Sequence, residues 1–462
     1  TDHAIKVGDN AFRYGGDFGD YPHNSTCCID GMVFADRTPR PGFYDMKKGY
    51  QPFAAEFSDG KITVKNYRYF EDLSDMYIEW SVEVNGESVM SGRIDDTDIA
   101  PQLTKEYVLF DKTPVSDCCF LNLTFRQKDA TKWAEADYET GWIQFDLSAE
   151  KVENQLCAKL PAVEEGDRFV KIEANGVVYT FDKPYGRISS VVCGGKEMLA
   201  EPVKVEMWKA HAWNQLGEAD DRRSAAIQAI SQKTYSATVT EDADCVKIAC
   251  PVSLSGPAVV PVLGGEIVYK FYGDGSAVVG FNGEFRQLLI DMNMHLPRFG
   301  FAFKLSGGYE NMEYFGKGPH EAYADRHLAC RYGKFETTVG DNFVPYIKPI
   351  ENGAHFGSRY GIVKNENGEG MIFAPAAEDT FFFNATHFTP AMLEETKHND
   401  ELVPLEDTMV YVDYRFDIRG NHGFYETVEP ERKWGFEPIE FAAAFKPFSG
   451  EINPFEFIKD KR

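Results

Sequence analysis

The sequence predicts a mainly β protein that is built from sandwiches of short strands. Segments in which apolar and polar residues alternate recur along most of the chain, and turn residues separate them. Aromatic residues make up 14% of the chain, with 36 Phe and 23 Tyr, while 40 Gly and 23 Pro interrupt it. Such a composition favours strands and turns over a helical bundle.

The length, the charge and the cysteines narrow the classes of function. A chain of 462 residues has room for about two to four domains. The 73 acidic and 48 basic residues give a net charge of −25, which is the opposite sign to that of a protein that binds nucleic acid or an anionic membrane. The nine cysteines include no CxxC pair, which argues against a zinc site, and we expect them to be free thiols in a reducing cytoplasm.

Residues 50–150 have the pattern of an immunoglobulin-like β-sandwich. The clearest hairpin runs over Met76–Gly92, where Ile78, Trp80 and Val82 alternate with polar residues and Asn85–Gly86 supplies the turn. Further strands are expected at Lys61–Phe70, Glu106–Phe110, Cys118–Gln127 and Gly141–Ser148. About seven short strands in ~100 residues are typical of that fold.

The remaining residues are predicted to form a linker over 151–166 and a large β-sandwich over 167–462. The linker range is polar and has no sustained period. Strand patterns resume at Arg168–Leu199, where Asn175–Gly176 is a second hairpin turn, and they continue to Glu440–Phe448. Helical patterns are confined to Gly217–Ile230 and Pro390–Lys397.

The residues alone do not assemble a complete catalytic constellation. The ten histidines are scattered without HExxH or HxH spacing, and no GxSxG elbow or P-loop is present. Glu321 and Asp325 lie four residues apart, but the surrounding HEAYADR segment is as readily a structural salt-bridge loop. The Gly-rich segment Tyr14–Phe53 can present oxygen ligands and aromatic faces to a small ligand, or it can be an irregular connector.

Several segments, in this order along the chain, resemble one glycosidase family. YGGDFGD (Tyr14–Asp20), followed by GMVFADRTPRP (Gly31–Pro41), closely resembles the end of the barrel domain of family-two glycoside hydrolases of the long β-galactosidase type. YFGKGPHEAYADR (Tyr314–Arg326) resembles that family's G-x-GP-x-E-x-Y-x-DR signature, and YIKPIENGAHFGSR (Tyr346–Arg359) its Y-x-x-P-x-ENG…R signature. Two further segments fit more loosely: Thr386–His398 and Asp417–Phe424.

The resemblance covers the whole chain and implies its architecture. Residues 1–49 would be the last strand and pocket loop of a (β/α)₈ barrel, and residues 50–150 the immunoglobulin-like domain. Residues 167–462 would be a large sandwich similar in fold to aldose mutarotases. Cut off from the rest of the barrel, the apolar residues of the first part are expected to lack partners, and to be disordered or to dock on another copy or on the missing half: Ala11, Phe12, Tyr14, Phe18, Met32, Val33 and Phe34.

The resemblance also implies an activity and an absence. The family hydrolyses terminal β-galactosides with retention, using two glutamates about 5 Å apart. Both glutamates, and the magnesium ligands, would lie in the barrel half that precedes this chain. No catalytic residue is therefore expected within residues 1–462, and the chain alone is expected to be inactive.

The resemblance places a sodium and sugar site in the first part of the chain. The Cys27 carbonyl would face a sodium ion, and the Asp30 side chain would ligate that ion and touch the sugar hydroxyls. Phe424 would stand where the family has a Trp that stacks on the aglycone sugar. The family often has Phe at the position of Cys27 and Asn at that of Asp30. From the residues alone, Asp30 can equally cap a turn before Gly31.

The expected partners are a β-galactoside, the amino-terminal half or a large subunit, and further copies of the same protein. An alternative is a non-catalytic small subunit, or a carbohydrate-binding or scaffold module. Another is a mutarotase-like epimerase, which would need an acid and a base facing each other on the large sandwich.

Overall fold

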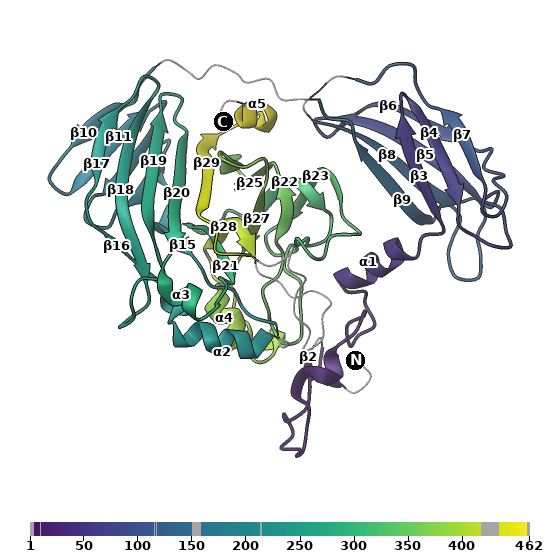
Figure 1. Ribbon diagram of the computed structural model, residues 1–462, viewed down its shortest axis with the longest axis horizontal. Helices are drawn as coiled ribbons and strands as arrows, with labels where there is room; N and C mark the ends of the chain where they lie inside the picture. Colours follow the sequence, from purple (N-terminus) through teal and green to yellow (C-terminus); the bar gives the residue numbers. More distant parts are fainter. Residues whose placement is uncertain are drawn as a thin grey trace. The chain divides into compact units, whose positions relative to one another are not determined.

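The structure is a computed structural model that describes residues 4–9, 11–114, 116, 118–149, 159–212, 215–416 and 434–459, with only the backbone of 216–218. The described residues form two compact units (Figure 1). Unit 1 comprises those within Thr1–Thr38, Asn154–His327 and Phe335–Arg462, and unit 2 those within Pro39–Glu153 and Leu328–Lys334. Strands dominate both units, which confirms the predicted mainly β fold.

Unit 2 is a sandwich of two antiparallel sheets that follows helix α1 (Pro41–Gly49). The three-stranded sheet has the order β3 (Phe53–Ser58), β4 (Lys61–Asn66), β7 (Thr104–Val108). The four-stranded sheet has the order β6 (Glu87–Ile94), β5 (Met76–Val84), β8 (Cys119–Gln127), β9 (Glu139–Asp146). The predicted hairpin turn between β5 and β6 is confirmed, because Asn85 and Gly86 both have positive φ angles, 53° and 78°.

The core of unit 2 lies between its two sheets. Phe53 and Ile62 from one sheet and Ile78, Leu121 and Phe125 from the other are all nearly inaccessible to solvent. The rings of Phe53 and Phe125 stack with centroids 3.7 Å apart. The period-2 alternation of β5 therefore buries one face of the strand, as the sequence predicts.

Unit 1 contains most of the strands. A hairpin of β1 (Ile5–Gly8) and β2 (Ala11–Arg13) precedes three larger sheets. The first has the order β10 (Ala162–Glu165), β11 (Phe169–Ala174), β12 (Val177–Asp182), β13 (Arg187–Cys193), β14 (Lys196–Glu197). The second has the order β15 (Leu199–Glu206), β21 (Arg298–Leu305), β28 (Thr408–Phe416), β27 (Phe381–Thr386), β24 (His355–Ser358).

The third sheet of unit 1 is ten-stranded. Its order is β16 (Ser231–Thr234), β18 (Cys245–Ser255), β19 (Leu263–Tyr272), β20 (Ala277–Phe285), β29 (Ile439–Ser449), β26 (Glu369–Pro375), β25 (Tyr360–Lys364), β22 (Asn311–Gly318), β23 (Arg331–Thr338), with β17 (Thr238–Glu241) also paired to β18. The helices of unit 1 are short: α2 (Leu216–Ser224), α3 (Gln287–Asp291), α4 (Pro390–Glu395) and α5 (Pro454–Lys459).

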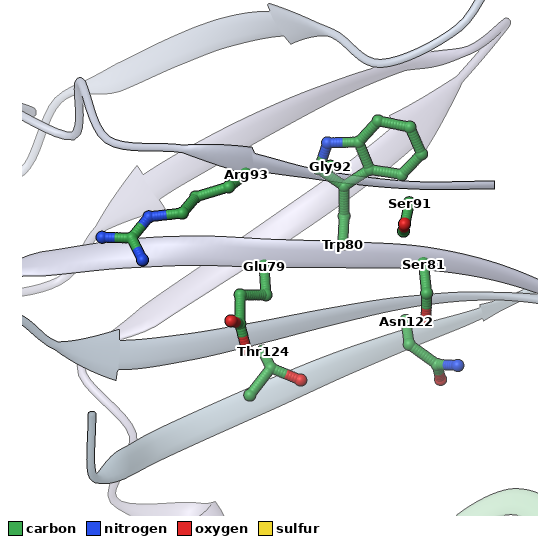
Figure 2. Close-up of a pocket in the computed structure, with 8 residues that line it drawn as sticks. All are labelled: Glu79, Trp80, Ser81, Ser91, Gly92, Arg93, Asn122 and Thr124. Atoms are coloured by element: carbon green, nitrogen blue, oxygen red, sulfur yellow. The ribbon is translucent and has the colours of Figure 1, made fainter. Parts of the chain in front are cut away.

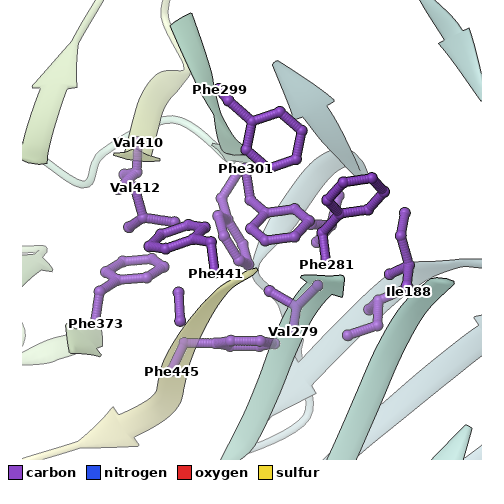
Figure 3. Packing of buried hydrophobic residues seen from close by; sticks show 14 of the residues in the cluster. Ile188, Val279, Phe281, Phe299, Phe301, Phe373, Val410, Val412, Phe441 and Phe445 are labelled. Atoms are coloured by element: carbon purple, nitrogen blue, oxygen red, sulfur yellow. The ribbon is translucent and has the colours of Figure 1, made fainter. Parts of the chain in front are cut away.

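Aromatic side chains fill the core of unit 1. Figure 3 shows Phe281 and Phe441 of the ten-stranded sheet packed against Phe299 and Phe301 of the neighbouring five-stranded sheet. The centroids of the Phe281 and Phe299 rings are 5.0 Å apart. Each buried phenylalanine contributes about 1.5–3 kcal/mol relative to an exposed one. This explains why a chain so rich in Phe folds into sandwiches.

Strands β21 and β28 use their two faces differently. Phe299 and Phe301 of β21 and Val412 of β28 point into the core. On the opposite face, Arg298 of β21 donates two 2.8 Å hydrogen bonds to Asp413 of β28, and both side chains are fully buried. Gly300 makes room for this pair, because a Cβ there would lie 2.2 Å from the Asp413 carboxylate.

The chain has more helices than its sequence pattern predicts. The predicted segments contain α2 and α4, but α1, α3 and α5 were not expected. All three are five to nine residues long, which is too short for a helical period to stand out. Helix α1 instead begins at Pro41, a residue favoured at the first helical position. Strand β10 lies within the range 151–166 that was assigned to a linker.

Asp413→Asn should destabilise unit 1 by about 3 kcal/mol, because buried Arg298 would lose its bidentate charged partner and keep only the longer, 3.4 Å contact with Glu351. Urea unfolding of the full chain measures the loss. As the control, Glu165→Gln removes one partner of the exposed Lys183–Glu165 pair and should cost at most about 1 kcal/mol. Equal losses in the two variants would contradict a structural role for the buried pair.

Candidate functional site

The candidate site is the segment that follows strand β2, and main-chain hydrogen bonds to short polar side chains hold it in shape. Asp17 accepts a 2.8 Å hydrogen bond from the Tyr14 amide, and Asp20 accepts one of 2.9 Å from the Gly16 amide. The bond from Gly16 lowers the pKa of Asp20. The Gly15 amide donates to the Ser25 carbonyl at 3.2 Å, which ties this turn to the 3₁₀ helix Ser25–Ile29.

The structure places the two predicted ligands at the end of that 3₁₀ helix. The Asp30 amide donates to the Cys27 carbonyl at 3.4 Å, so the two residues lie one helical turn apart. Asp30 is solvent-exposed, whereas its neighbour Ile29 is buried. Gly31, with φ of 130°, then turns the chain away. Phe424, the third predicted site residue, lies outside the described residues.

The underside of the segment packs on the large sandwich of the same unit. Phe12, Tyr14 and Ile29 form a buried cluster with Ile347, and the ring of Phe34 lies 5.7 Å from that of Tyr346. The expectation that the apolar residues of the first part would lack partners was wrong for Phe12, Tyr14 and Phe34. It holds for Phe18 and Met32, which are 56% and 40% exposed.

Polar contacts reinforce this packing. Arg13 makes a bidentate ion pair with Asp400, at 2.9 and 3.1 Å. The Tyr14 hydroxyl donates to the Lys397 carbonyl at 2.8 Å. Burial, together with the charge of Asp17, raises the pKa of Tyr14 to about 12, so the phenol keeps the proton that it donates. The segment is therefore anchored to residues that lie more than 380 positions later in the sequence.

The segment Tyr314–Arg326, which resembles a family signature, contributes a buried polar network around Glu321 rather than an exposed acid. The Glu321 carboxylate accepts hydrogen bonds from the Tyr346 hydroxyl at 2.5 Å and from the Gly353 amide at 2.9 Å, and it pairs with Arg326. The structural interpretation of this loop is therefore confirmed for Glu321. Because Tyr346 also contacts Phe34, the network supports the underside of the candidate site.

A separate open pocket of about 410 Å³ lies on the four-stranded sheet of unit 2 (Figure 2). Strands β5, β6 and β8 supply its lining: Glu79, Trp80, Ser81, Ser91, Gly92, Arg93, Asn122 and Thr124. Its charged groups have their own neighbours, since Glu79 pairs with Arg126 and Arg93 with Asp95. None of the predicted site residues lines it.

Among the residues that the structure describes, no group of three or more His, Cys, Asp or Glu side chains could hold a metal ion. The eight described cysteines are free thiols, as predicted. The described helices are all too short to cross a membrane.

Three family models match successive ranges of the chain. The family model described as "Beta galactosidase small chain" matches residues 173–441, more than half of the sequence. The chain belongs to this family. Two further models match earlier ranges of the chain: "Beta-galactosidase, domain 4" matches residues 62–148, and "Glycosyl hydrolases family 2, TIM barrel domain" matches residues 1–55.

Curated relatives agree with the family. The β-galactosidase of Actinobacillus pleuropneumoniae is 28% identical over 95% of this chain and 44% of its own length. That of Staphylococcus xylosus is 28% identical over 96% of this chain and 45% of its own length. The chain thus spans less than half the length of these relatives. A solved galactose 1-epimerase from Lactobacillus acidophilus NCFM covers 63% of the chain, with 99% of its own length, a TM-score of 0.34 and 10% identity.

His355 should make the stability of unit 1 depend on pH. Its ring is buried, stacks on Tyr314 and lies 2.8 Å from the Asn342 amide oxygen. Burial lowers the pKa of His355 to about 3. The folded protein therefore keeps the imidazole neutral, whereas the unfolded chain binds a proton below about pH 6.5. The stabilisation is complete above that pH and is lost as the pH falls from 6.5 toward 3.

Between pH 6 and 5 this residue should account for a loss of about 1 kcal/mol in the free energy of unfolding. Urea unfolding at several pH values measures the slope, and His355→Gln should reduce it. Burial lowers the pKa of His211 to about 4, so part of the slope remains in the variant. Identical slopes in wild type and His355→Gln would contradict the assignment.

Proposed function

We propose that this chain is the part of a β-galactosidase that supplies the rim of the galactose pocket and the supporting β domains. The whole enzyme would hydrolyse terminal β-galactosides with retention, through two glutamates that lie in the amino-terminal part of the barrel. The observation that carries the proposal is the joint match of residues 1–55, 62–148 and 173–441 to successive parts of β-galactosidases.

The geometry of the candidate site supports a role at the rim of a sugar pocket. Asp30 is exposed and directly follows a 3₁₀ helix, whose last residue, Ile29, is buried. A carboxylate held in this way can accept hydrogen bonds from two sugar hydroxyls, and each such charge-assisted bond is stronger than a neutral one. The segment therefore combines a fixed backbone with an accessible acceptor.

Four buried or partly buried carboxylates of unit 1 have structural partners, which supports the expectation that the catalytic pair lies elsewhere. Glu321 pairs with Arg326, and Asp413 and Glu351 both contact Arg298. Glu394 accepts a hydrogen bond from the Trp208 indole and pairs with Arg223. Retaining hydrolysis needs one carboxyl that gives up a proton and another that attacks the sugar. An arginine partner favours the ionised form of a carboxylate and keeps it in contact with the guanidinium, so such a carboxylate is less suited to donate a proton or to attack the sugar.

The donor chemistry at the candidate site fits a sodium ion. Sodium is a hard cation, and hard cations take oxygen ligands. The Cys27 carbonyl and an Asp30 carboxylate oxygen would supply two of them, with the others coming from the barrel half. The ion would orient Asp30 and offset its charge beside the sugar hydroxyls. Any magnesium of the enzyme would lie in the barrel half as well.

The name of the matching family favours a second form of the same proposal, in which the chain is a small subunit that complements a separate large one. The reading frame upstream of this chain distinguishes the two forms. A barrel that continues into Thr1 supports a single polypeptide, whereas a separate start codon supports two subunits. In either form we propose a cytoplasmic enzyme that assembles into oligomers.

The isolated chain should not hydrolyse a chromogenic β-galactoside, because on this proposal it lacks both the general acid and the nucleophile. Each of these groups contributes orders of magnitude to the rate. Mixing it with the polypeptide encoded upstream should restore activity. The matched control is the upstream polypeptide alone. Turnover by the isolated chain that disappears when a carboxylate within residues 1–462 is mutated would overturn the proposal.

Asp30→Ala should raise the sodium concentration needed for half-maximal activity of the assembled enzyme by about tenfold or more, because one charged oxygen ligand is lost. Asp30→Asn keeps an oxygen ligand and should lie between wild type and Asp30→Ala. Asp9→Ala, which removes an exposed carboxylate from the same part of the chain, is the control. If Asp30 only caps a turn, the sodium dependence and the KM of Asp30→Ala will equal those of wild type.

A further inference from the structure

His398 lies between two carboxylates that belong to distant parts of the sequence. Its Nε2 atom is 2.8 Å from the Asp17 carboxylate, and its Nδ1 atom is 2.8 Å from that of Glu401. The side chain is only 5% exposed. Each nitrogen of the imidazole thus has a carboxylate oxygen within hydrogen-bonding distance.

The Asp17 end of this bridge is itself held in place. The Asp17 oxygen that contacts His398 also accepts the hydrogen bond from the Tyr14 amide. The ring of Tyr14 lies against that of His398, with centroids 4.9 Å apart. His398 therefore contacts both ends of the turn that begins the candidate site.

From this turn, two routes lead to the predicted ligands. The Gly15 amide donates to the Ser25 carbonyl, at the start of the 3₁₀ helix that contains Cys27. Tyr14 also packs in the same buried cluster as Ile29, the residue directly before Asp30. A shift of the turn would thus displace both Cys27 and Asp30, because each lies within two residues of a contact to the turn.

We propose that His398 is a positioning residue that fixes the pocket loop, residues 14–31, to the large sandwich. The inference rests on the proposed function, because it assigns His398 a purpose at that same site. His398 does not contact the predicted ligands and acts through Asp17 and Tyr14. In the assembled enzyme it holds Asp30 and the Cys27 carbonyl where sugar and sodium bind.

A second histidine of unit 1 provides a matched control. His387 also pairs with a carboxylate, since its Nε2 atom lies 2.7 Å from Glu310, and it contacts the Asp407 carbonyl through Nδ1. None of these partners belongs to the pocket loop. His387→Gln and His398→Gln therefore remove equivalent chemistry, but only the second removes a contact to residues 14–31.

The first experiment uses the isolated chain and hydrogen exchange, so it does not depend on activity. In His398→Gln the protection of the amides in residues 14–31 should fall about tenfold or more, the effect of losing one charge-assisted hydrogen bond. Strands β26 and β29 should keep their protection, which shows that the sandwich is folded. Asp17→Asn, which changes the loop partner of His398, should lower the protection of the loop in the same way. His387→Gln should leave the protection of the loop unchanged.

The second experiment measures the kinetics of the assembled enzyme. His398→Gln should raise the KM for a β-galactoside and the sodium requirement several-fold more than it changes kcat, with His387→Gln equal to wild type. Unchanged loop protection in His398→Gln, or unchanged KM with restored activity, overturns the inference. If the wild-type mixture is inactive, the proposed function fails instead, and the exchange data still decide whether His398 anchors the loop.

Discussion

The packing of Phe12, Tyr14 and Ile29 on Ile347 is the contact on which the candidate site depends. The pocket loop has a single short 3₁₀ helix and several glycines with positive φ, so its own backbone gives it little rigidity. Burial of its apolar side chains holds the loop against the sandwich. The Arg13–Asp400 ion pair and the hydrogen bond of the Tyr14 hydroxyl then set its orientation. The exposed Asp30 is a consequence of this arrangement, because its neighbour Ile29 faces inward.

Beneath the loop, the sandwich contains ion pairs with buried carboxylates. Replacing a buried ion pair by apolar residues of similar volume is often neutral or stabilising, whereas removing one partner is costly. Each partner of the Glu321–Arg326 and Arg298–Asp413 pairs therefore depends on the presence of the other. Glu321 holds Tyr346 and the Gly353 amide, and Tyr346 meets Phe34 at the edge of the pocket loop. The ion pair thus helps to shape a surface on which the loop can rest.

The sequence predicted those features that depend on local chemistry. Asn85–Gly86 and Asn175–Gly176 form hairpin turns because both residues of each pair tolerate positive φ. The mainly β fold followed from period-2 alternation, as in β5. Helix α1 was missed because nine residues, two of them glycines, show no clear helical period. Which carboxylate pairs with which arginine was equally hidden, since Arg298 and Asp413 lie 115 positions apart.

The candidate site was predictable only in part. The resemblance pointed to Cys27 and Asp30, but no local pattern reveals that Phe12 and Tyr14 find their partner at Ile347, more than 330 positions away. His398 stood in a segment that resembles the family, yet a lone histidine has no spacing signal, and its role emerges only when Asp17 is seen beside it.

On the proposed function, the departure at Asp30 has an electrostatic consequence for the site. The resemblance implies an Asn at this position in much of the family, so Asp30 would add a negative charge beside a pocket that would also contain two catalytic carboxyls. Like charges close together raise one another's proton affinity, so an unscreened Asp30 would disturb the protonation on which retaining hydrolysis depends. A bound cation would cancel that charge. If the proposed function holds, such a cation would therefore serve the protonation state of the pocket as well as sugar binding.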